Sequence, residues 1–434
     1  MAISLRNTVI CVLIVAFILL ATLQTTDIGN RSSNSRNANI EPSTSSSATS
    51  TSFSQCTHPV HKLIFIKTHK TGSSTIATTL ARYADEKGLK LATPIWTHIF
   101  HETKSFSHNM VLSFGDMGHF DILTSHARYN RKEMDMVISN PKYITIIRNP
   151  VKQLESAYSY YSMAKHIGIQ TDGDHELQAF LKQPRYFFDN YDYFMKVQSW
   201  NGQIFDLGLE HADHLNQTLV RRKIQQIDAE FDLVMINEYF DESLVLLRKQ
   251  FCWDWEDIVY ISKGVRKTTL RHKIRPELAA KIQQLNSADV QLYDHFNRTF
   301  WGRVAQYGPN FNKDVLYFKE VREEITSRCL DMNSHSNPAY DKRVENHKLK
   351  PNAPKYCKNM ISGTMQYVNW MKFMYVFHRV LLPLTLVCLG CVFMLFLYRR
   401  FRRGNGDQYR LLDLDTTNLG SDKTVLPIYS KQNN

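Results

Sequence analysis

The sequence is poor in glycine, with 17 in 434 residues, and none stands where a nucleotide triphosphatase needs one. The phosphate-binding loop of those enzymes is GxxxxGK[ST], in which the lysine follows the second glycine. In residues 61–76, HKLIFIKTHKTGSSTI, Lys70 precedes Gly72 and no glycine lies upstream of it in the loop. This order argues against an ordinary nucleotide triphosphatase.

Signatures of nucleic-acid and metal binding are also missing. The chain has 53 Lys and Arg against 41 Asp and Glu, a net charge of +12 that nucleic acid would suit. We find no zinc-ligand spacing, no basic helix, no RNA-binding signature and no cluster of metal ligands. We therefore predict no nucleic-acid partner and no metal requirement. The charge fits an enzyme that handles a multiply charged nucleotide.

Cysteine is scarce, at seven residues, and its placement indicates an oxidising compartment. Three cysteines fall in hydrophobic segments, namely Cys11, Cys388 and Cys391. The other four form an even set that allows three disulfide pairings: Cys56, Cys252, Cys329 and Cys357. Three glycosylation sequons, at Asn30, Asn216 and Asn297, agree with a luminal location for the region between.

Residues 61–76 predict a buried strand, a turn and a helix start. The apolar run 63–66 has the length and β-branched content of a strand, and Ser73, Ser74 and Thr75 supply hydroxyls suited to capping a helix. A helix reached in this way points backbone N–H groups at one spot, which suits a phosphate or sulfate. The candidate binding residues are Lys67, Lys70, Thr71, Gly72, Ser73, Ser74 and Thr75. At this point, a purely structural turn capped by serines remains the alternative.

A second segment, YITIIRNPVKQLESAYSYY at 143–161, repeats this arrangement. An apolar strand ends at Arg148, Asn149 is a helix N-cap candidate, and Pro150 fits the first helical position. Arg148 and Ser156 would then stand at the strand end and two turns into the helix. Because the guanidinium bonds phosphate oxygens in pairs, we predict that these two residues hold one phosphate.

Both segments resemble known sites. The order K-T-G-S-S-T after a strand resembles the 5′-phosphosulfate loop of sulfotransferases, which use 3′-phosphoadenylyl sulfate (PAPS). Strand–R-N-P–helix–Ser resembles the site by which they hold its 3′-phosphate. With LTSHARY and the run at 237–258, the chain resembles the galactose 3-O-sulfotransferase family over about residues 56–360. The resemblance implies a P-loop-like α/β sulfotransferase fold, with a central mainly parallel sheet flanked by helices.

His126, at the end of a predicted strand over 120–125, is the candidate general base. Sulfuryl transfer needs a group that takes the proton of the acceptor hydroxyl, and imidazole has the side-chain pKa closest to neutral. The family pattern also has a histidine at this position. His69, inside the phosphosulfate loop, is the rival.

The other strand ends complete the predicted site. Strands over 63–66, 143–147 and 232–236 end at the lysine-bearing loop, at Arg148, and at Asn237 and Glu238. Because ligands of open α/β sheets bind outside the carboxyl ends of parallel strands, these groups should share one edge. We predict that Lys70, assisted by Lys67, neutralises charge on the leaving nucleotide.

The predicted reaction moves the sulfuryl group of PAPS to the 3-hydroxyl of a terminal galactose. The resemblance leaves open whether a glycolipid or a glycoprotein glycan carries that galactose. The alternative is a catalytically inactive, membrane-tethered protein that binds a nucleotide or glycan. The sequence does not indicate an oligomeric state.

The chain ends predict two membrane segments, and the resemblance implies the Golgi membrane. Residues 8–23 are apolar, and a signal anchor or a cleaved signal peptide both fit. Residues 380–397 are long enough to span, and the arginines at 399–403 favour a cytosolic tail over a helix packed on the domain. The predicted order is cytosolic 1–7, signal anchor 8–23, luminal stem 24–55, catalytic domain 56–360, second span 376–398 and cytosolic tail 399–434.

Overall fold

The computed structural model describes residues 58–97, 99–166, 174–262, 265–266, 274–336 and 344–415. The chain divides into two units, and the larger one, residues 46–374, holds the sheet and most of the helices. The remaining unit contains residues 1–45 and 375–434. The stem, the predicted first membrane segment, Cys56 and Asn30 lie outside the described residues.

A five-stranded parallel sheet forms the centre of the larger unit, in the order β2-β3-β1-β4-β5. Its strands are β1 (Leu63–Ile66), β2 (Leu91–Ala92), β3 (Ile122–Leu123), β4 (Lys142–Ile147) and β5 (Leu233–Ile236). All four residues of β1 are fully buried, which fits their continuous apolar run. The predicted parallel α/β sheet is confirmed. The strand predicted over 120–125 is shorter, because only residues 122 and 123 pair with their neighbours.

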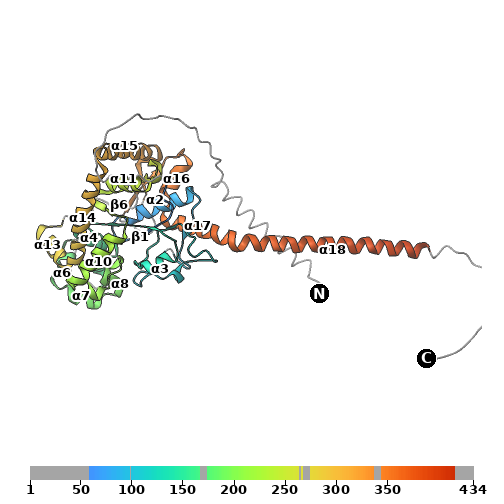
Figure 1. Cartoon of the computed structure of the whole chain (residues 1–434), viewed down its shortest axis with the longest axis horizontal. Helices are drawn as coiled ribbons and strands as arrows, with labels where there is room; N and C mark the ends of the chain where they lie inside the picture. The colour runs from blue at the N-terminus through green and yellow to red at the C-terminus, as the bar shows by residue number, and fades with distance from the viewer. Residues whose placement is uncertain are drawn as a thin grey trace, which may run out of the picture. The chain divides into compact units, whose positions relative to one another are not determined.

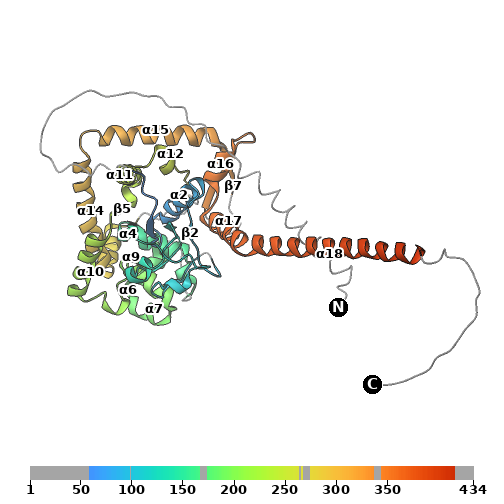
Figure 2. The same cartoon turned by 45° about the vertical axis from the view of Figure 1, so that its right-hand side comes forward.

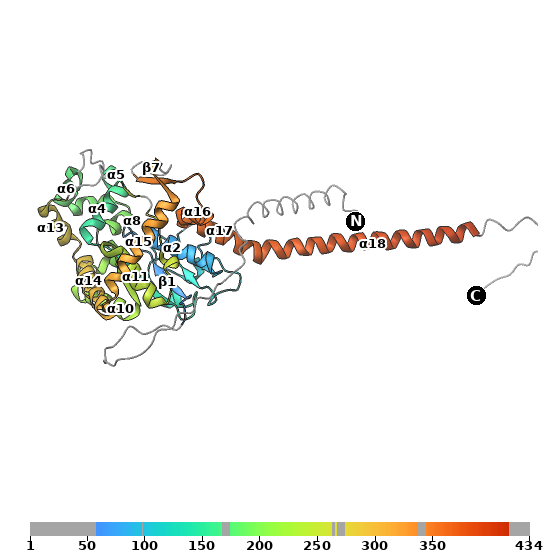
Figure 3. The same cartoon turned by 90° about the horizontal axis from the view of Figure 1, so that it is seen from above.

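Helices cover both sides of this sheet (Figures 1 and 2). One side carries α2 (Ser73–Glu86), α11 (Phe240–Phe251), α12 (Trp255–Ile258), α15 (Phe311–Cys329) and α16 (Lys355–Ile361). The other carries α4 (Pro150–Tyr160), α6 (Asp174–Lys182), α7 (Pro184–Asn190), α8 (Tyr193–Ser199) and α10 (Gln217–Glu230). Seen from above, α15 lies along α11 (Figure 3).

Shorter pieces and the long α14 complete this unit. They are η1 (His108–Met110), α3 (Arg131–Asp135), α5 (Met163–His166), α9 (Gly202–Asp206), η2 (His211–Asp213), η3 (Asn237–Tyr239), α13 (Pro276–Leu285) and α14 (Ser287–Tyr307). An aromatic cluster packs between α4 and the helices that follow it. Phe180, Phe187 and Phe188 are among its buried members, and Trp200 stacks on Phe188 with ring centroids 4.4 Å apart.

A small antiparallel sheet follows in the order β6-β8-β7, from β6 (Val265–Arg266), β7 (Leu330–Ser336) and β8 (Val344–Leu349). A disulfide joins Cys329, at the end of α15, to Cys357 in α16. Cys252 is also disulfide-bonded. Of the three pairings that the sequence left open, the Cys329–Cys357 bond is compatible with only one.

The C-terminal helices are α17 (Thr364–Val376), a π-helical turn η5 (Phe377–Leu381) and α18 (Leu382–Asp415). Together, residues Thr364–Arg402 form one helix that is long and apolar enough to cross a membrane. Most large apolar side chains from Leu382 to Phe401 are exposed. The predicted span at 376–398 falls inside this helix.

The aromatic cluster includes a histidine that the fold keeps neutral. His214 is buried against Trp200, and its Nδ1 has no hydrogen-bond partner among the described residues. Burial, with a smaller contribution from His211, lowers the pKa of His214 from 6.5 to about 4. A protonated ring would place an N–H donor where no acceptor lies.

We therefore expect a pH-dependent stability that this residue controls. The unfolded chain binds a proton at His214 more readily than the folded chain, so acid favours unfolding. From about pH 6.5 down to pH 4, wild type should lose up to about 3 kcal/mol relative to His214→Phe. The measurement is chemical unfolding at several pH values, with the exposed His119→Gln as the control. Parallel stability curves for wild type and His214→Phe would contradict this account.

Candidate active site

The carboxyl edge of the sheet brings the predicted groups together. The loop after β1 carries Lys67 and Lys70, His126 follows β3, and Arg148 ends β4. The His126 Nδ1 lies 2.9 Å from the carbonyl oxygen of Lys67, and the Arg148 guanidinium donates to the carbonyl of Lys70 at 3.1 Å. Because β1 pairs with both β3 and β4, the two neighbouring strand ends hold the loop from either side.

The loop is fixed by its own hydroxyls. The Thr68 hydroxyl lies 2.7 Å from that of Thr71 and donates to the carbonyl of Ile146 on β4. The Ser73 hydroxyl donates back to the Thr68 carbonyl. Thr68, Thr71 and Ser73 are all buried. The Thr71 and Ser73 hydroxyls therefore shape the loop, and these residues would meet a ligand through backbone N–H groups.

The start of α2 differs from the capping expected of its serines. The N-cap is Gly72, with a φ of 81°, and no side chain caps the helix. Ser73 cannot cap because its hydroxyl is used within the loop, while Ser74 is exposed and Thr75 is half-buried. A helix start without a side-chain cap keeps its positive dipole end and N–H groups for an anion.

Gly72 is required by close packing as well as by its backbone conformation. A Cβ atom there would lie 2.5 Å from Nδ2 of Asn237 and 3.2 Å from the ring of Phe240. The Asn237 amide donates to the Thr71 carbonyl at 2.9 Å. The end of β5 thus also supports the loop.

The two lysines have different surroundings. Burial lowers the pKa of Lys67 to about 8, since the charged amine loses hydration. The Lys70 ammonium lies over the ring of Tyr160 on α4, with its nitrogen 3.4 Å from the ring centroid. Arg148 adds a third positive group at the same edge.

Arg148 follows directly after β4 and Ser156 lies within α4, as the sequence predicts. Asn149 caps α4 by accepting from Val151 and Lys152, and Pro150 is the first helical residue. The backbone of Arg148 is held on both sides by Gln203, which accepts from its N–H at 2.7 Å and donates to its carbonyl at 2.9 Å. Ser156 is half-buried on α4. No hydrogen bond joins its hydroxyl to Arg148 in the described structure.

The two candidate histidines stack on each other, with ring centroids 4.1 Å apart and ring planes 12° apart. A carbonyl only accepts, so the contact with Lys67 puts a proton on Nδ1 of His126, and in the neutral ring Nε2 is then the nitrogen with the lone pair. His69 is held more tightly. Its Nδ1 and its backbone N–H both bond the carboxylate of Asp206, at 2.9 and 2.8 Å, and Phe194 packs against its other side.

Asp206 and Gln203 are site residues that the sequence did not reveal. Both lie on α9, a five-residue helix without an apolar period, far along the chain from their partners. Asp289 supports this helix by accepting from the N–H groups of Gln203 and Ile204, at 3.1 and 2.8 Å. Burial raises the pKa of Asp289 to about 7. No signal short of a three-dimensional contact would have identified these residues.

The arrangement offers anion binding and a proton acceptor at one edge. Lys67, Lys70, Arg148 and the start of α2 suit a group with several charged oxygens, and the imidazole of His126 lies beside the loop. Among the described residues, no three His, Cys, Asp or Glu side chains gather as a metal site would require.

Comparison with known proteins identifies the family. The profile described as Galactose-3-O-sulfotransferase matches residues 2–384. The chain belongs to the galactose-3-O-sulfotransferase family. The expected family and the sulfotransferase class of enzyme are thereby confirmed.

Individual relatives with galactose-3-O-sulfotransferase or galactosylceramide sulfotransferase names are also similar to the chain. Mouse galactosylceramide sulfotransferase is 29% identical over 72% of this chain and 78% of its own length. Human galactose-3-O-sulfotransferase 2 is 34% identical over 63% and 69%, and human galactose-3-O-sulfotransferase 3 is 33% identical over 68% and 69%. A crystal structure of a sulfotransferase from Alicyclobacillus acidocaldarius has a TM-score of 0.33 at 12% identity, covering 54% of this chain and 96% of that chain. That likeness is too weak to carry an argument about the site.

Gly72→Ala should open the loop, and Gly88→Ala is its matched control. Both glycines have positive φ, 81° and 66°, but a Cβ at Gly88 meets nothing within 4 Å. The backbone strain alone should cost about 1–2 kcal/mol in Gly88→Ala. Gly72→Ala should cost at least about 1 kcal/mol more, because Asn237 must also move. Equal unfolding midpoints in denaturant would show that the contact with Asn237 does not hold the loop.

Proposed function

We propose that this protein transfers the sulfuryl group of PAPS to the 3-hydroxyl of a terminal galactose. The observation that carries the proposal is the imidazole of His126, whose Nδ1 is tied to the carbonyl of Lys67, beside a helix start that no side chain caps. A proton acceptor and an anion site thus share one loop. Membership of the family gives the reaction class.

The donor would lie along the strand ends. The 5′-phosphosulfate fits the loop 67–75, where Lys67, Lys70 and the backbone N–H groups of α2 carry positive charge. The 3′-phosphate fits Arg148, which precedes α4. The Ser156 hydroxyl, about two turns into α4, would be a second contact. Gln203 fixes the backbone of Arg148, so the guanidinium is placed before the nucleotide arrives.

The reaction is an in-line displacement at sulfur. His126 Nε2 takes the proton of the galactose 3-hydroxyl while that oxygen forms its bond to sulfur. The bond between sulfur and the bridging phosphate oxygen breaks, and 3′-phosphoadenosine 5′-phosphate leaves with the electron pair. Lys70, with Lys67, neutralises the charge on the bridging oxygen. Preplaced donors of this kind usually supply the largest catalytic contribution.

The acceptor class follows from the relatives. One is named for galactosylceramide and others for galactose 3-O-transfer, so a galactose on a glycolipid or a glycoprotein glycan is proposed. The alternative, an inactive membrane-tethered nucleotide- or glycan-binding protein, is disfavoured because His126 and Arg148 both bond the backbone of the loop that carries Lys70.

The proposed location is the Golgi lumen, with membrane segments at 8–23 and 376–398. A disulfide between Cys329 and Cys357 fits an oxidising lumen. Asn216 is exposed and caps α10 through its carbonyl oxygen, which leaves its amide nitrogen as the glycan-bearing atom. Asn297 is half-buried within α14 and is the less accessible sequon.

Transfer of labelled sulfate from PAPS to a panel of galactosides tests the function directly. Lys70→Ala should lower the turnover number by about 10²–10³-fold, since one donor to the leaving group is lost. The control is Lys62→Ala, which removes an exposed lysine from the loop before β1. Wild-type turnover in Lys70→Ala would refute the phosphosulfate assignment of the loop.

The choice between the two histidines is a separate prediction. His126→Ala should lower turnover by about 10²–10⁴-fold with PAPS binding nearly unchanged, because a proton acceptor is lost but no donor contact is. His69→Ala should cost less, since the ring is fixed by Asp206 and packed between His126 and Phe194. Turnover and PAPS affinity are measured on both variants. A larger loss in His69→Ala would assign the base to the loop.

A further inference from the structure

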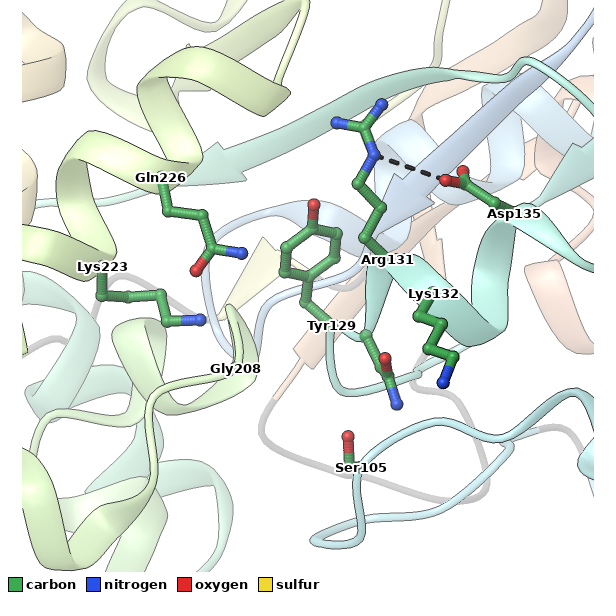
Figure 4. Close-up of a pocket in the computed structure, with 9 residues that line it drawn as sticks. Ser105, Tyr129, Arg131, Lys132, Asp135, Gly208, Lys223 and Gln226 are labelled. Carbon is green, nitrogen blue, oxygen red and sulfur yellow. Dashed lines mark hydrogen bonds and ion pairs between the residues drawn. The ribbon is translucent and has the colours of Figure 1, made fainter.

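A polar pocket of about 590 Å³ lies beside the site, between α3 and α10 (Figure 4). It is lined by Ser105, Tyr129, Asn130, Arg131, Lys132, Asp135, Gly208, Lys223 and Gln226. Its volume is within the range of small-ligand sites. Lys223 and Gln226 extend from α10 on one side and Lys132 from α3 on the other, with Tyr129 and Gly208 between them.

Two of the three cations in this pocket are not neutralised by a described neighbour. Arg131 pairs with Asp135, 3.4 Å away, and both lie together beyond the ring of Tyr129 (Figure 4). Lys132 and Lys223 have no ion-pair partner within the described part of the chain. Burial is the main cause that lowers the pKa of Lys223, and it outweighs the opposing effect of the carboxylates of Glu230 and Glu210.

The two carboxylates that act on Lys223 are engaged with other residues. Glu230 accepts from the Tyr129 hydroxyl at 2.5 Å and from the Gln226 amide at 3.1 Å, and Glu210 pairs with Arg128 at 2.8 Å. Asp135, the only acidic residue that lines the pocket, also accepts from Tyr143 at 2.7 Å. The pocket is thus surrounded by positive groups and hydrogen-bond donors, which suits the oxygens of an anion.

One residue connects the pocket to the candidate active site. The backbone carbonyl of Asp206 accepts from the N–H of Tyr129 at 2.9 Å, while its side chain holds His69. Tyr129 is three residues after His126, at most about 10 Å of extended chain. Gly208 must approach closely, since a Cβ there would lie 2.7 Å from the Tyr129 carbonyl. The pocket and the proposed base thus share one short segment of the chain, residues 126–129.

We propose that the pocket is an acceptor subsite for a sulfate or carboxylate carried by a sugar next to the reacting galactose. The proposal rests on the proposed function for the position of the galactose. The chain then favours anionic oligosaccharides over neutral ones, through Lys223 and Lys132. PAPS binds elsewhere, at the loop after β1, and does not use these lysines.

The first test compares lactose with lactose sulfated on the 6-hydroxyl of its glucose, using the full chain in detergent. Lys223→Gln should lower kcat/KM for the sulfated acceptor at least about tenfold, since a charged hydrogen bond is lost, and leave kcat/KM for lactose within about twofold. Lys223→Arg should retain the preference. Arg222→Gln, an exposed neighbour that does not line the pocket, is the control. Equal effects on both acceptors, or none on either, would overturn the proposal.

The second test does not depend on transfer. Acylation of Lys223 by an amine reagent is followed by mass spectrometry with sulfated lactose, lactose or inorganic sulfate at equal concentrations. Sulfated lactose alone should slow the labelling strongly. Equal protection by inorganic sulfate would show a site for free anions, and equal protection by lactose a site for neutral sugar, and either result overturns the proposal. Protection without any sulfate transfer would instead refute the proposed function and keep the pocket.

Discussion

The buried carboxylate of Asp206 is the contact on which the geometry of the site depends. It holds both the backbone and the ring of His69, and so fixes the middle of the loop that carries the two lysines. Hydrogen bonds to charged groups are each worth about 1.5–3 kcal/mol, and the loss of one partner leaves a buried charge uncompensated. Asp289 in turn fixes the start of the helix that carries Asp206. The loop is therefore anchored by α9 as well as by its own hydroxyls.

This anchoring helps to keep three cations at one edge of the sheet. Lys67, Lys70 and Arg148 repel one another, and the lowered pKa of Lys67 reflects the cost of holding its charge in a buried place. Backbone carbonyls of Lys67 and Lys70 accept from His126 and Arg148, and the ring of Tyr160 supports the Lys70 ammonium. A nucleotide with several negative charges would relieve this repulsion. The same residues would therefore bind the nucleotide and hold positive charge in place before the reaction begins.

The sequence predicted those parts of the site that lie at the ends of buried strands. The runs at 63–66, 143–147 and 232–236 are continuous and apolar, as parallel strands covered on both faces must be, and their observed limits agree within one residue. It did not predict the cap at Gly72, because Ser73 turns back into the loop only when Thr68 is folded beside it. The sequence also contains no indication of Asp206, Gln203 or the pocket at Lys223. Each of these depends on contacts between segments far apart in the chain, and such contacts leave no periodic pattern in the local sequence.

Asp206 connects the loop that is proposed to bind the donor with the pocket that is proposed to bind part of the acceptor. Asp206 contacts His69 with its side chain and Tyr129 with its backbone, so a shift of either site reaches the other through one residue. The proposed base, His126, and the pocket residue Tyr129 belong to the same short segment, whose residues 126 and 128 also pair with the segment at 100–106. A segment held at so many points cannot reposition the base for each acceptor. If the pocket receives the acceptor as proposed, selection among acceptors comes from the side chains that line it, where a change of charge would alter binding without moving the proposed base.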